Sequence, residues 1–544
     1  MLFYQRRVGF LSSLGPKDDS TEPPRLALDT DHLSRRAFVG VSAAFLASLP
    51  AGVPARITRD MRRPRIDQGI SVGDPSVDGA IIWSRTDRPA RLCVEWSTYP
   101  DFRNRVRVEP QNALRITDFT AQIPLIGLPN DVDIFYRATF EDLATGERSA
   151  PKDGFFRTPC VDKERPVRFA WSGDVCGQGF GINPKIGGMT IFESIREANP
   201  DLFIHCGDVV YADAPLREKK RIGTKQTWHN LVIPEKRKVA ETIDEFRGQF
   251  RYNLLDDNLR RFNASVPTAY LWDDHETKNN WWPGRRLSDR RYRVRSCDVL
   301  SARAKHAFFE YCPMARKREA PGRIYRRLSQ GPNLDVFMTD TRSYRGINSR
   351  NRQEQAGPQA AFFGAEQLAW LCQELERSTA TWKVIACPQP LSLLVAHAGY
   401  DFDGAANGLG GRPRGRELEV ASILNFIKRK SIKNVVWITA DVHYAAAHRY
   451  DPKSAAFKDF EPFWEFVAGP LNAGTFGPNP LDPTFGPTVE FLSIPKDLRP
   501  GRSPLDGFQF FGMGEVNPST KKLTVSLHKL DGTVIWSTDL MPST

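Results

Sequence analysis

Four polar clusters constrain this chain more than any other feature, because each one directly follows a short apolar segment. The clusters occupy residues 171–177, 205–211, 272–280 and 439–444. Apolar segments with the character of buried strands occupy residues 167–171, 202–206, 269–272, 336–339, 383–386 and 435–439. Amphipathic helices are predicted among them, at residues 189–198, 243–262, 300–311, 365–377 and 417–430. This pattern predicts an α/β domain whose polar clusters lie at the carboxyl ends of its strands.

The residue types in these clusters indicate a metal site. They include Asp, Tyr, Asn and His. Hard cations prefer carboxylate and amide oxygens, and imidazole suits iron, zinc or manganese. A single aspartate at a strand end is more often a turn former or a helix cap than a ligand. Four such clusters favour a shared metal site, because gathered carboxylates repel one another without a cation.

Several blocks resemble one known family. Residues 207–211 (Gly-Asp-Val-Val-Tyr) resemble the GDxxY block of metallophosphatases, and residues 441–443 (Asp-Val-His) resemble their closing block. Residues 273–276 (Asp-Asp-His-Glu) stand where the wider superfamily has Asn-His-Glu. With further matching segments, the chain is similar to the PhoD-type alkaline phosphatase/phosphodiesterase family over about residues 66–540; these segments are 71–75, 279–282 and 340–345.

The resemblance implies a fold, a cofactor and an activity. The implied fold is an αββα metallophosphatase sandwich core preceded by an all-β immunoglobulin-like sandwich domain. The implied cofactor is ferric iron with a second divalent metal, calcium by preference, with zinc or manganese as alternatives. The implied activity is hydrolysis of phosphomonoesters, phosphodiesters or both by metal-activated water.

The resemblance also assigns residues. Asp208 is expected to bridge two cations, and Tyr211 to bind ferric iron as a phenolate. His275 is expected to protonate the leaving group or stabilise transition-state charge, with a structural hydrogen bond as the alternative. Arg342 is expected to grip phosphate, with an ordinary salt bridge as the alternative. The implied metal ligands are Asp174, Asp208, Tyr211, Asp274, Asn280, Asp441 and His443.

One segment departs from the superfamily pattern. The superfamily often places a histidine ligand after the strand at residues 383–386. Here Cys387-Pro388-Gln389-Pro390 follows that strand, and the next histidine, His397, is too far along to be assigned. The departure leaves open whether this ligand is dispensable here or the second metal site is altered.

Residues 1–55 resemble a twin-arginine export signal. Arg35-Arg36 is followed by Phe38, a mildly apolar stretch and small residues ending at Ala55. The expected location is therefore periplasmic or secreted, reached through the twin-arginine export machinery. The signal begins unusually far from Met1, which suggests an upstream start-site assignment. A surface helix with a chance arginine pair is the alternative.

Two domains are expected after the signal. Residues 66–158 contain short strand-like segments separated by turn signals, which predicts a β-sandwich. Residues 165–540 form the expected metallophosphatase domain. Ser71 lies in a GxSxG pattern at residues 69–73, but a turn and a strand-like segment follow it instead of the helix that a nucleophilic serine requires.

Charge and composition exclude several classes. The formal net charge is +12, yet basic and acidic residues are interspersed, and the longest basic run noted, residues 217–221, contains an acid. This pattern argues against a nucleic-acid partner and suits an anionic substrate. The eight cysteines show no CxxC spacing, and no apolar stretch is long enough for a membrane span. We expect a monomer.

Three alternatives remain open from the sequence. A phospholipase D-like phosphodiesterase of the same family would need an exposed apolar rim, for which Trp281, Trp282, Phe362 and Phe363 are candidates. A non-catalytic secreted binding protein would fit the departure at Cys387. A serine hydrolase would depend on Ser71 alone.

Overall fold

The computed structural model describes residues 62–161, 165–224, 226–316 and 318–543. The predicted export signal at residues 1–55 lies outside these ranges. Within them the fold is a mixed α/β fold built mainly on two large sheets. No helix in the described ranges combines the length and the apolar character that a membrane crossing requires.

The first large sheet has nine strands and spans most of the chain. Its strand order is β23-β22-β21-β9-β10-β13-β1-β2-β6. The central strands β9, β10 and β13 are parallel, and β21 pairs antiparallel with β9. The bounds are β1 Ile70–Ser76, β2 Gly79–Arg85, β6 Thr120–Ile126, β9 Val167–Ser172, β10 Leu202–Cys206, β13 Thr268–Leu271, β21 Phe510–Val516, β22 Leu523–Lys529 and β23 Val534–Leu540.

The second large sheet has seven strands in the order β14-β15-β16-β17-β19-β18-β20. Strands β15, β16, β17 and β19 run parallel. The bounds are β14 Arg326–Ser329, β15 Leu334–Met338, β16 Trp382–Ala386, β17 Val435–Thr439, β18 Ala446–Tyr450, β19 Phe463–Val467 and β20 Pro487–Leu492. All six strands predicted from apolar segments are therefore present, within two residues of the expected bounds.

Successive side chains along each strand point to opposite faces of its sheet. In both large sheets, both faces are buried. Trp171 and Ile204 share one core with Val384 and Ile438 of the other sheet, so the two sheets pack face to face. The opposite faces of the sheets contribute to separate cores with helices: α2 (Ile191–Ala198) and α4 (Asp257–Asn263) on the first sheet, α6 (Ala365–Arg377) and α7 (Glu417–Arg429) on the second.

The helix predicted over residues 243–262 is two helices in the structure. α3 (Ile243–Asn253) begins with a capping box between Thr242 and Glu245. It ends before Asp256, whose side chain accepts the N–H of Leu259 and caps α4. The sequence prediction missed this break because apolar spacing continues across it. The remaining helix, α5 (Cys297–Tyr311), is capped by Ser296.

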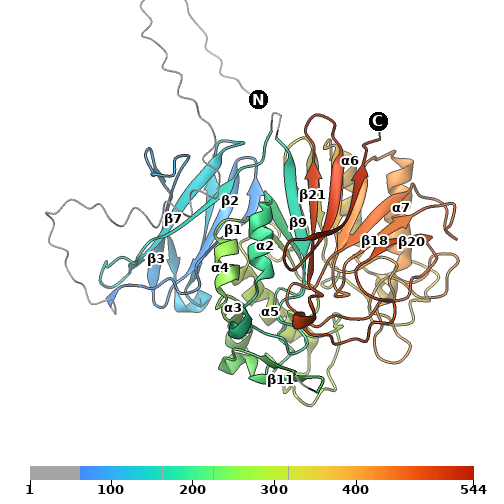
Figure 1. Ribbon diagram of the computed structural model, residues 1–544, viewed down its shortest axis with the longest axis horizontal. Helices are drawn as coiled ribbons and strands as arrows, with labels where there is room; N and C mark the ends of the chain where they lie inside the picture. The colour runs from blue at the N-terminus through green and yellow to red at the C-terminus, as the bar shows by residue number, and fades with distance from the viewer. Residues whose placement is uncertain (1–61, 162–164, 225, 317, 544) are drawn as a thin grey trace, which may run out of the picture. The chain divides into compact units, whose positions relative to one another are not determined.

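The N-terminal strands form two layers. β1, β2 and β6 extend the nine-stranded sheet, where β1 lies parallel to β13. A separate sheet contains β3 (Ala90–Ser97), β4 (Val106–Arg107), β5 (Gln111–Ala113), β7 (Asp133–Asp142) and β8 (Lys152–Arg157). Figure 1 shows these strands in blue and cyan. Val72, Ile82, Leu92 and Phe140 come from both layers and share one core.

A two-stranded hairpin, β11 (Lys219–Ile222) and β12 (Gln226–His229), lies outside both large sheets. It contains part of the basic run noted in the sequence. The candidate site lies elsewhere, at the carboxyl ends of the parallel strands of the two large sheets.

Candidate metal centre

The candidate ligands gather where the parallel strands of both sheets end. Asp174, Asp208 and Asp274 follow β9, β10 and β13 of the first sheet. Asp441 and His443 follow β17 of the second sheet. The segments that end in polar clusters are therefore brought together from two sheets, as the strand-end pattern predicts for one site.

Backbone conformation turns these side chains out of the strand direction. Asp174, Asp208, Asn280, Asp441 and His443 all have positive φ, between 53° and 69°. A non-glycine residue pays on the order of 1 kcal/mol or more for such a left-handed conformation. Residues of this kind cluster at functional sites, because surrounding structure must hold them in place.

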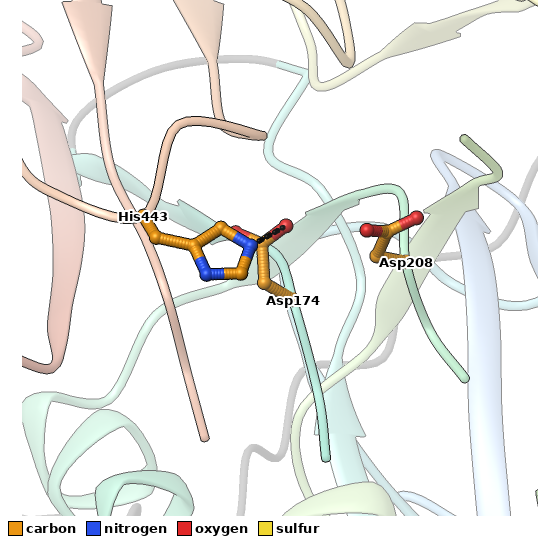
Figure 2. A group of neighbouring side chains, drawn as sticks. All are labelled: Asp174, Asp208 and His443. Atoms are coloured by element: carbon orange, nitrogen blue, oxygen red, sulfur yellow. Dashed lines mark ion pairs between the residues drawn. The ribbon is translucent and has the colours of Figure 1, made fainter. Parts of the chain in front are cut away.

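Asp174, Asp208 and His443 form a compact group in which the ligand atoms lie within 4.8 Å of one another. Figure 2 shows the imidazole of His443 facing the carboxylate of Asp174, with Asp208 alongside. The His443 Nε2 atom lies 3.4 Å from Asp174 Oδ1, while Nδ1 lies 2.5 Å from the Gly474 carbonyl oxygen. The carbonyl fixes the proton on Nδ1, which leaves Nε2 free to act as a ligand.

The phenol of Tyr211 joins this group. Its oxygen lies 2.9 Å from His443 Nε2, and its ring stacks on His275 with a centroid separation of 4.1 Å. Burial, followed by the charges of Asp208 and Asp174, raises the pKa of Tyr211 well above its ordinary value. Without a cation the phenol is therefore neutral; a bound cation would favour the phenolate.

Two further groups continue the cluster. Asp208, Asp274 and His275 form one, and Asp273, Asp274 and Asp441 form the other. Asp208 belongs to two groups and Asp274 to two, so neighbouring groups share a carboxylate. Shared carboxylates are the arrangement that two adjacent cations require.

Several carboxylate oxygens in the cluster are buried without a hydrogen-bond partner among the described residues. They are Asp174 Oδ2, Asp273 Oδ2, Asp274 Oδ1 and Asp441 Oδ2. A buried carboxylate oxygen without a partner is costly. Burial and then the neighbouring carboxylates raise the pKa of Asp208 and of Asp441 well above the usual range. Cations would satisfy these oxygens and offset the repulsion, so the residues present fit a metal centre.

A cavity of about 220 Å³ opens onto this cluster. Eight of its twelve lining residues have acidic, imidazole or amide side chains, and four are apolar. The lining residues are Asp208, Asp274, His275, Asn279, Asn280, Val395, Ala396, Asp441, Val442, His443, Phe476 and Asn479. Asn280 therefore lies beside the cluster, although it belongs to none of the three carboxylate and imidazole groups.

His275 lies in the cavity wall and is held by an aspartate that the sequence interpretation missed. Its Nδ1 lies 2.7 Å from Oδ1 of Asp213. Burial alone would lower the pKa of His275, but the charges of Asp213 and Asp274 outweigh it and raise the pKa to about 9. Asp213 also accepts the Asn279 N–H at 2.9 Å. Its position two residues after Tyr211 was the available sequence signal.

Glu276 is a second residue that the sequence interpretation left without a role. Its carboxylate accepts the backbone N–H groups of Val209 at 2.7 Å and Asp273 at 2.9 Å. It therefore ties the loop after β10 to the loop after β13. This link fixes the spacing between Asp208 and Asp274.

The structure does not bring Arg342 to the cavity, contrary to the expectation that it grips phosphate. Arg342 is fully buried, and its Nε donates to Asp273 Oδ1 at 2.5 Å. Its terminal nitrogens donate to both carboxylate oxygens of Asp403, at 3.0 and 2.8 Å. A buried guanidinium needs such partners, and Arg342 is not among the residues that line the cavity. The alternative reading, a salt bridge, describes its contacts.

The departure after β16 has a structural consequence. Gln389 is buried, and its Nε2 donates to Asp403 at 2.6 Å instead of facing the metal cluster. His397 Nδ1 lies 3.1 Å from the Asn280 amide nitrogen, beside the cavity wall. Neither residue belongs to a described group that could hold a metal.

The apolar rim considered for a lipid substrate is absent at three of its four proposed positions. Trp281, Phe362 and Phe363 are buried in hydrophobic cores, and Trp282 is only half-buried. Ser71 lies within β1. It is therefore not at the sharp turn between a strand and a helix that nucleophilic serines occupy.

Comparison with protein families gives two adjoining matches. A family model described as PhoD-like phosphatase matches residues 169–527. A second model, described as PhoD-like phosphatase, N-terminal domain, matches residues 51–160. Together the two models account for most of the chain and meet near the start of β9.

Individual proteins and structures give the same result. Alkaline phosphatase D of Bacillus subtilis (strain 168) is 26% identical over 438 residues, which cover 75% of this chain and 70% of that protein. The structure of PhoD aligns with a TM-score of 0.64 and 19% identity, over 88% of this chain and 92% of that chain. Purple acid phosphatase PPD1 from yellow lupin (Lupinus luteus) seeds aligns with a TM-score of 0.51 and 14% identity, over 88% and 74%. These two structures share the fold.

Proposed function

The chain belongs to the PhoD-like phosphatase family, a family of phosphoester hydrolases, and from this premise we propose that it hydrolyses phosphomonoesters, phosphodiesters or both at the metal centre. The observation that carries this proposal is the set of buried carboxylate oxygens without partners beside the cavity. The proposed fold is the αββα metallophosphatase sandwich with an N-terminal immunoglobulin-like domain at residues 66–158 and a catalytic domain at residues 165–540.

We assign the ligands to two cations. Asp174, Asp208, Tyr211 and His443 would hold one cation, for which the phenol and imidazole favour ferric iron. Asp208 would be shared with a second cation, and the all-oxygen set of Asp274, Asn280 and Asp441 suits calcium. When bound, the cations supply positive charge that stabilises the phosphoryl oxygens and lowers the pKa of water.

The protein's own groups then position and protonate the substrate. His275 lies in the cavity wall with Nδ1 bound to Asp213, so its Nε2 is available to donate a proton. In the absence of cations the charges of Asp213 and Asp274 raise its pKa to about 9, which favours the protonated ring. We propose that His275 donates this proton to the departing alkoxide oxygen. Arg342 acts as a positioning residue, because it contacts Asp273 and lies 3.7 Å from Asp274.

We further propose that residues 1–55 direct export to the periplasm or the medium. The support is the Arg35-Arg36 pair with the mildly apolar stretch that follows. Replacement of both arginines by lysine should retain the protein in the cytoplasm. Export of that variant at the normal rate would contradict the twin-arginine route without affecting the proposed hydrolytic activity.

Metal content and turnover, measured on the same preparation, test the central proposal. Purified protein should contain bound transition metal and hydrolyse a chromogenic monoester or diester. Asp208→Asn should lose both metal and turnover, because Asp208 is shared between two groups. Asp244→Asn, at an exposed position, is the matched control. Full turnover by metal-free protein, or by Asp208→Asn, would refute the mechanism. Bound metal without turnover would favour a binding protein.

A further inference from the structure

A positively charged segment of the chain begins five residues after Asn280, and its residues have no role in the proposed hydrolysis. Residues 285–295, here named the arginine segment, contain six arginines and one aspartate. Six arginines and one aspartate give this segment a formal net charge of +5, whereas the four basic residues and one acid of residues 217–221 give +3. Arg286, Arg290 and Arg293 are exposed.

Two contacts attach the arginine segment to the metal centre. Arg285 donates from Nη1 to the carbonyl oxygens of Asn279, at 3.0 Å, and Asn280, at 2.8 Å. Both asparagines line the cavity. Arg291 donates from Nη1 to the Asp213 carbonyl oxygen at 3.4 Å. Because Asp213 holds His275, the arginine segment borders the cavity on the side of the proposed proton donor.

The backbone of the arginine segment is held by hydrogen bonds at several points. The Leu287 N–H donates to the Arg295 carbonyl at 2.8 Å. The N–H groups of Arg293 and Val294 donate to the buried carboxylate of Glu241, at 2.6 and 2.8 Å. The exposed guanidinium groups therefore project from a fixed backbone, which lowers the entropy cost of binding a ligand.

The positive charge of the arginine segment is largely uncompensated. The carboxylate of Asp289 pairs with Arg291 at 2.8 Å. In the described part of the chain, Arg286, Arg290 and Arg293 have no ion-pair partner, whereas many exposed arginines elsewhere do, such as Arg148 with Glu141. An ordinary solvated surface, on which positive charges are balanced by nearby carboxylates, would show such ion-pair partners. Unpaired guanidinium groups in a segment whose Arg285 contacts two residues of the cavity lining suit a second anionic group of the substrate.

We propose that the arginine segment binds a further phosphate group of the substrate, in addition to the phosphate that is hydrolysed. The substrate class is therefore a phosphate ester that carries two or more phosphates. Guanidinium groups bind phosphate oxygens in a bidentate manner, and the clustered charge attracts polyanions to the cavity. This inference rests on the proposed function and identifies its substrate class.

Matched substrates and matched variants test the inference. Glucose 1,6-bisphosphate is compared with glucose 1-phosphate, which lacks the second phosphate. The variant replaces Arg286, Arg290 and Arg293 by Gln. The control variant replaces the exposed arginines Arg91, Arg107 and Arg115 by Gln, which gives the same change in net charge away from the cavity lining.

Each exposed ion pair contributes a few-fold at most, so three together should change KM by roughly tenfold. We expect KM for the bisphosphate to rise by about this factor in the Arg286/Arg290/Arg293 variant. In the same variant, KM for the monophosphate should stay within about twofold of the unmodified protein. In the control variant, KM for both substrates should stay within about twofold. Added salt should remove the advantage of the bisphosphate in the unmodified protein.

A binding measurement separates failure of this inference from failure of the proposed function. Inorganic tripolyphosphate should bind metal-free protein more tightly than inorganic phosphate, and the triple variant should lose that preference. Equal binding by the variant and the unmodified protein would overturn the role of the arginine segment. Absence of turnover with both sugar phosphates and with a chromogenic diester would refute the proposed function alone, because the binding result would still stand.

A second pair of substrates distinguishes the sources of the extra phosphate. A synthetic phosphodiester trimer of propanediol is compared with the dimer, and the bisphosphate arm above serves as the small-molecule case. A gain for the trimer only would identify a chain substrate, and a gain for the bisphosphate only would identify a polyphosphorylated small molecule. A gain for neither would overturn the proposal.

Discussion

Nδ1 of His275 lies 2.7 Å from Oδ1 of Asp213, which fixes the orientation of an imidazole that lines the cavity and has a raised pKa. The carboxylate orients the ring and favours its protonated form. Burial alone would raise the pKa of Asp213, but the charge of His275 lowers it. The two side chains therefore form an ion pair in the wall of the metal centre.

His275→Asn should lower kcat by roughly 10²- to 10⁴-fold for esters with poor leaving groups, because proton transfer to the departing oxygen is lost. Esters of nitrophenol should be affected much less, since nitrophenolate departs without a proton. Asp213→Asn should show the same dependence on the leaving group with a smaller loss. Steady-state rates across a series of phenyl phosphates provide the measurement. An equal loss for every leaving group would contradict the assignment of His275 as proton donor.

Asp403→Asn should weaken metal binding, although Asp403 is not a candidate ligand. Asp403 holds Arg342 at both terminal nitrogens, and Arg342 in turn holds Asp273 and lies 3.7 Å from the proposed ligand Asp274. Loss of such an outer partner costs roughly 10- to 100-fold in metal affinity. Metal content after equilibrium dialysis measures this effect, at a temperature where circular dichroism shows the variant folded.

Asp74→Asn is the matched control for the loss of Asp403. Asp74 forms a comparable buried pair with Arg326, at 2.5 and 2.8 Å, outside the metal centre. Both variants should lose stability, by about 3–5 kcal/mol, because a buried guanidinium loses its carboxylate. Only Asp403→Asn should lose metal. If Asp74→Asn loses metal equally, the loss of metal in Asp403→Asn results from general destabilisation and not from the contact with Arg342.

Glu417→Gln should stabilise the protein at alkaline pH. Burial and then the charge of Asp482 raise the pKa of Glu417 to about 9, from an ordinary value of 4.5. The folded state therefore holds a proton that the unfolded chain releases, so this contribution is fully present below about pH 4.5 and is lost as pH rises through about 9. Glutamine keeps an acceptor for Asn407, which donates to Glu417 at 2.6 Å, and removes the titration.

Denaturant unfolding at about pH 6 and about pH 8.5 measures this effect. The variant should gain about 1 kcal/mol or more relative to the unmodified protein at the higher pH. Glu461→Gln, at an exposed position, should show no such change. An identical pH dependence in Glu417→Gln and the unmodified protein would show that Glu417 is ionised in the folded state.

Gly512→Ala should destabilise the core between the nine-stranded sheet and its neighbours. A Cβ atom at Gly512 would lie 2.2 Å from the ring of Trp171, which is fully buried and cannot move aside. Overpacking of this kind typically costs 1–3 kcal/mol. Thermal unfolding provides the measurement, and Gly322→Ala, where the added methyl group meets open space, is the control. Equal unfolding temperatures for the two variants would contradict this packing.

Removal of metal should lower stability as well as activity. The unpartnered oxygens of Asp174, Asp273, Asp274 and Asp441 would then repel one another, and a ligand that binds only the folded state stabilises it by mass action. Protein treated with a chelator should unfold at a lower temperature and recover when metal is restored. An unchanged unfolding temperature in protein verified to be metal-free would contradict the ligand assignment.

The outline of the fold and the types of ligand could be predicted from local sequence. Apolar strand segments and the clusters that follow them are contiguous in the chain, so their residue types and spacing are visible without the structure. Three of these clusters contain Asp174, Asp208 and His443, which the family resemblance assigns as ligands, and the structure places their ligand atoms within 4.8 Å of one another. The break before Asp256 was missed because it depends on a side-chain cap within a continuous apolar pattern.

The sequence by itself determined an α/β chain of the PhoD-like phosphatase family with acidic, phenolic and imidazole groups at its strand ends. Only the tertiary structure decided which partners those groups have. Asp441 and His443 reach the centre because a second sheet packs on the first, and Arg342 turns away from the cavity because Asp403, distant in sequence, pairs with it. Such pairings depend on long-range packing, where burial makes a charged group bind whichever opposite charge the fold places beside it.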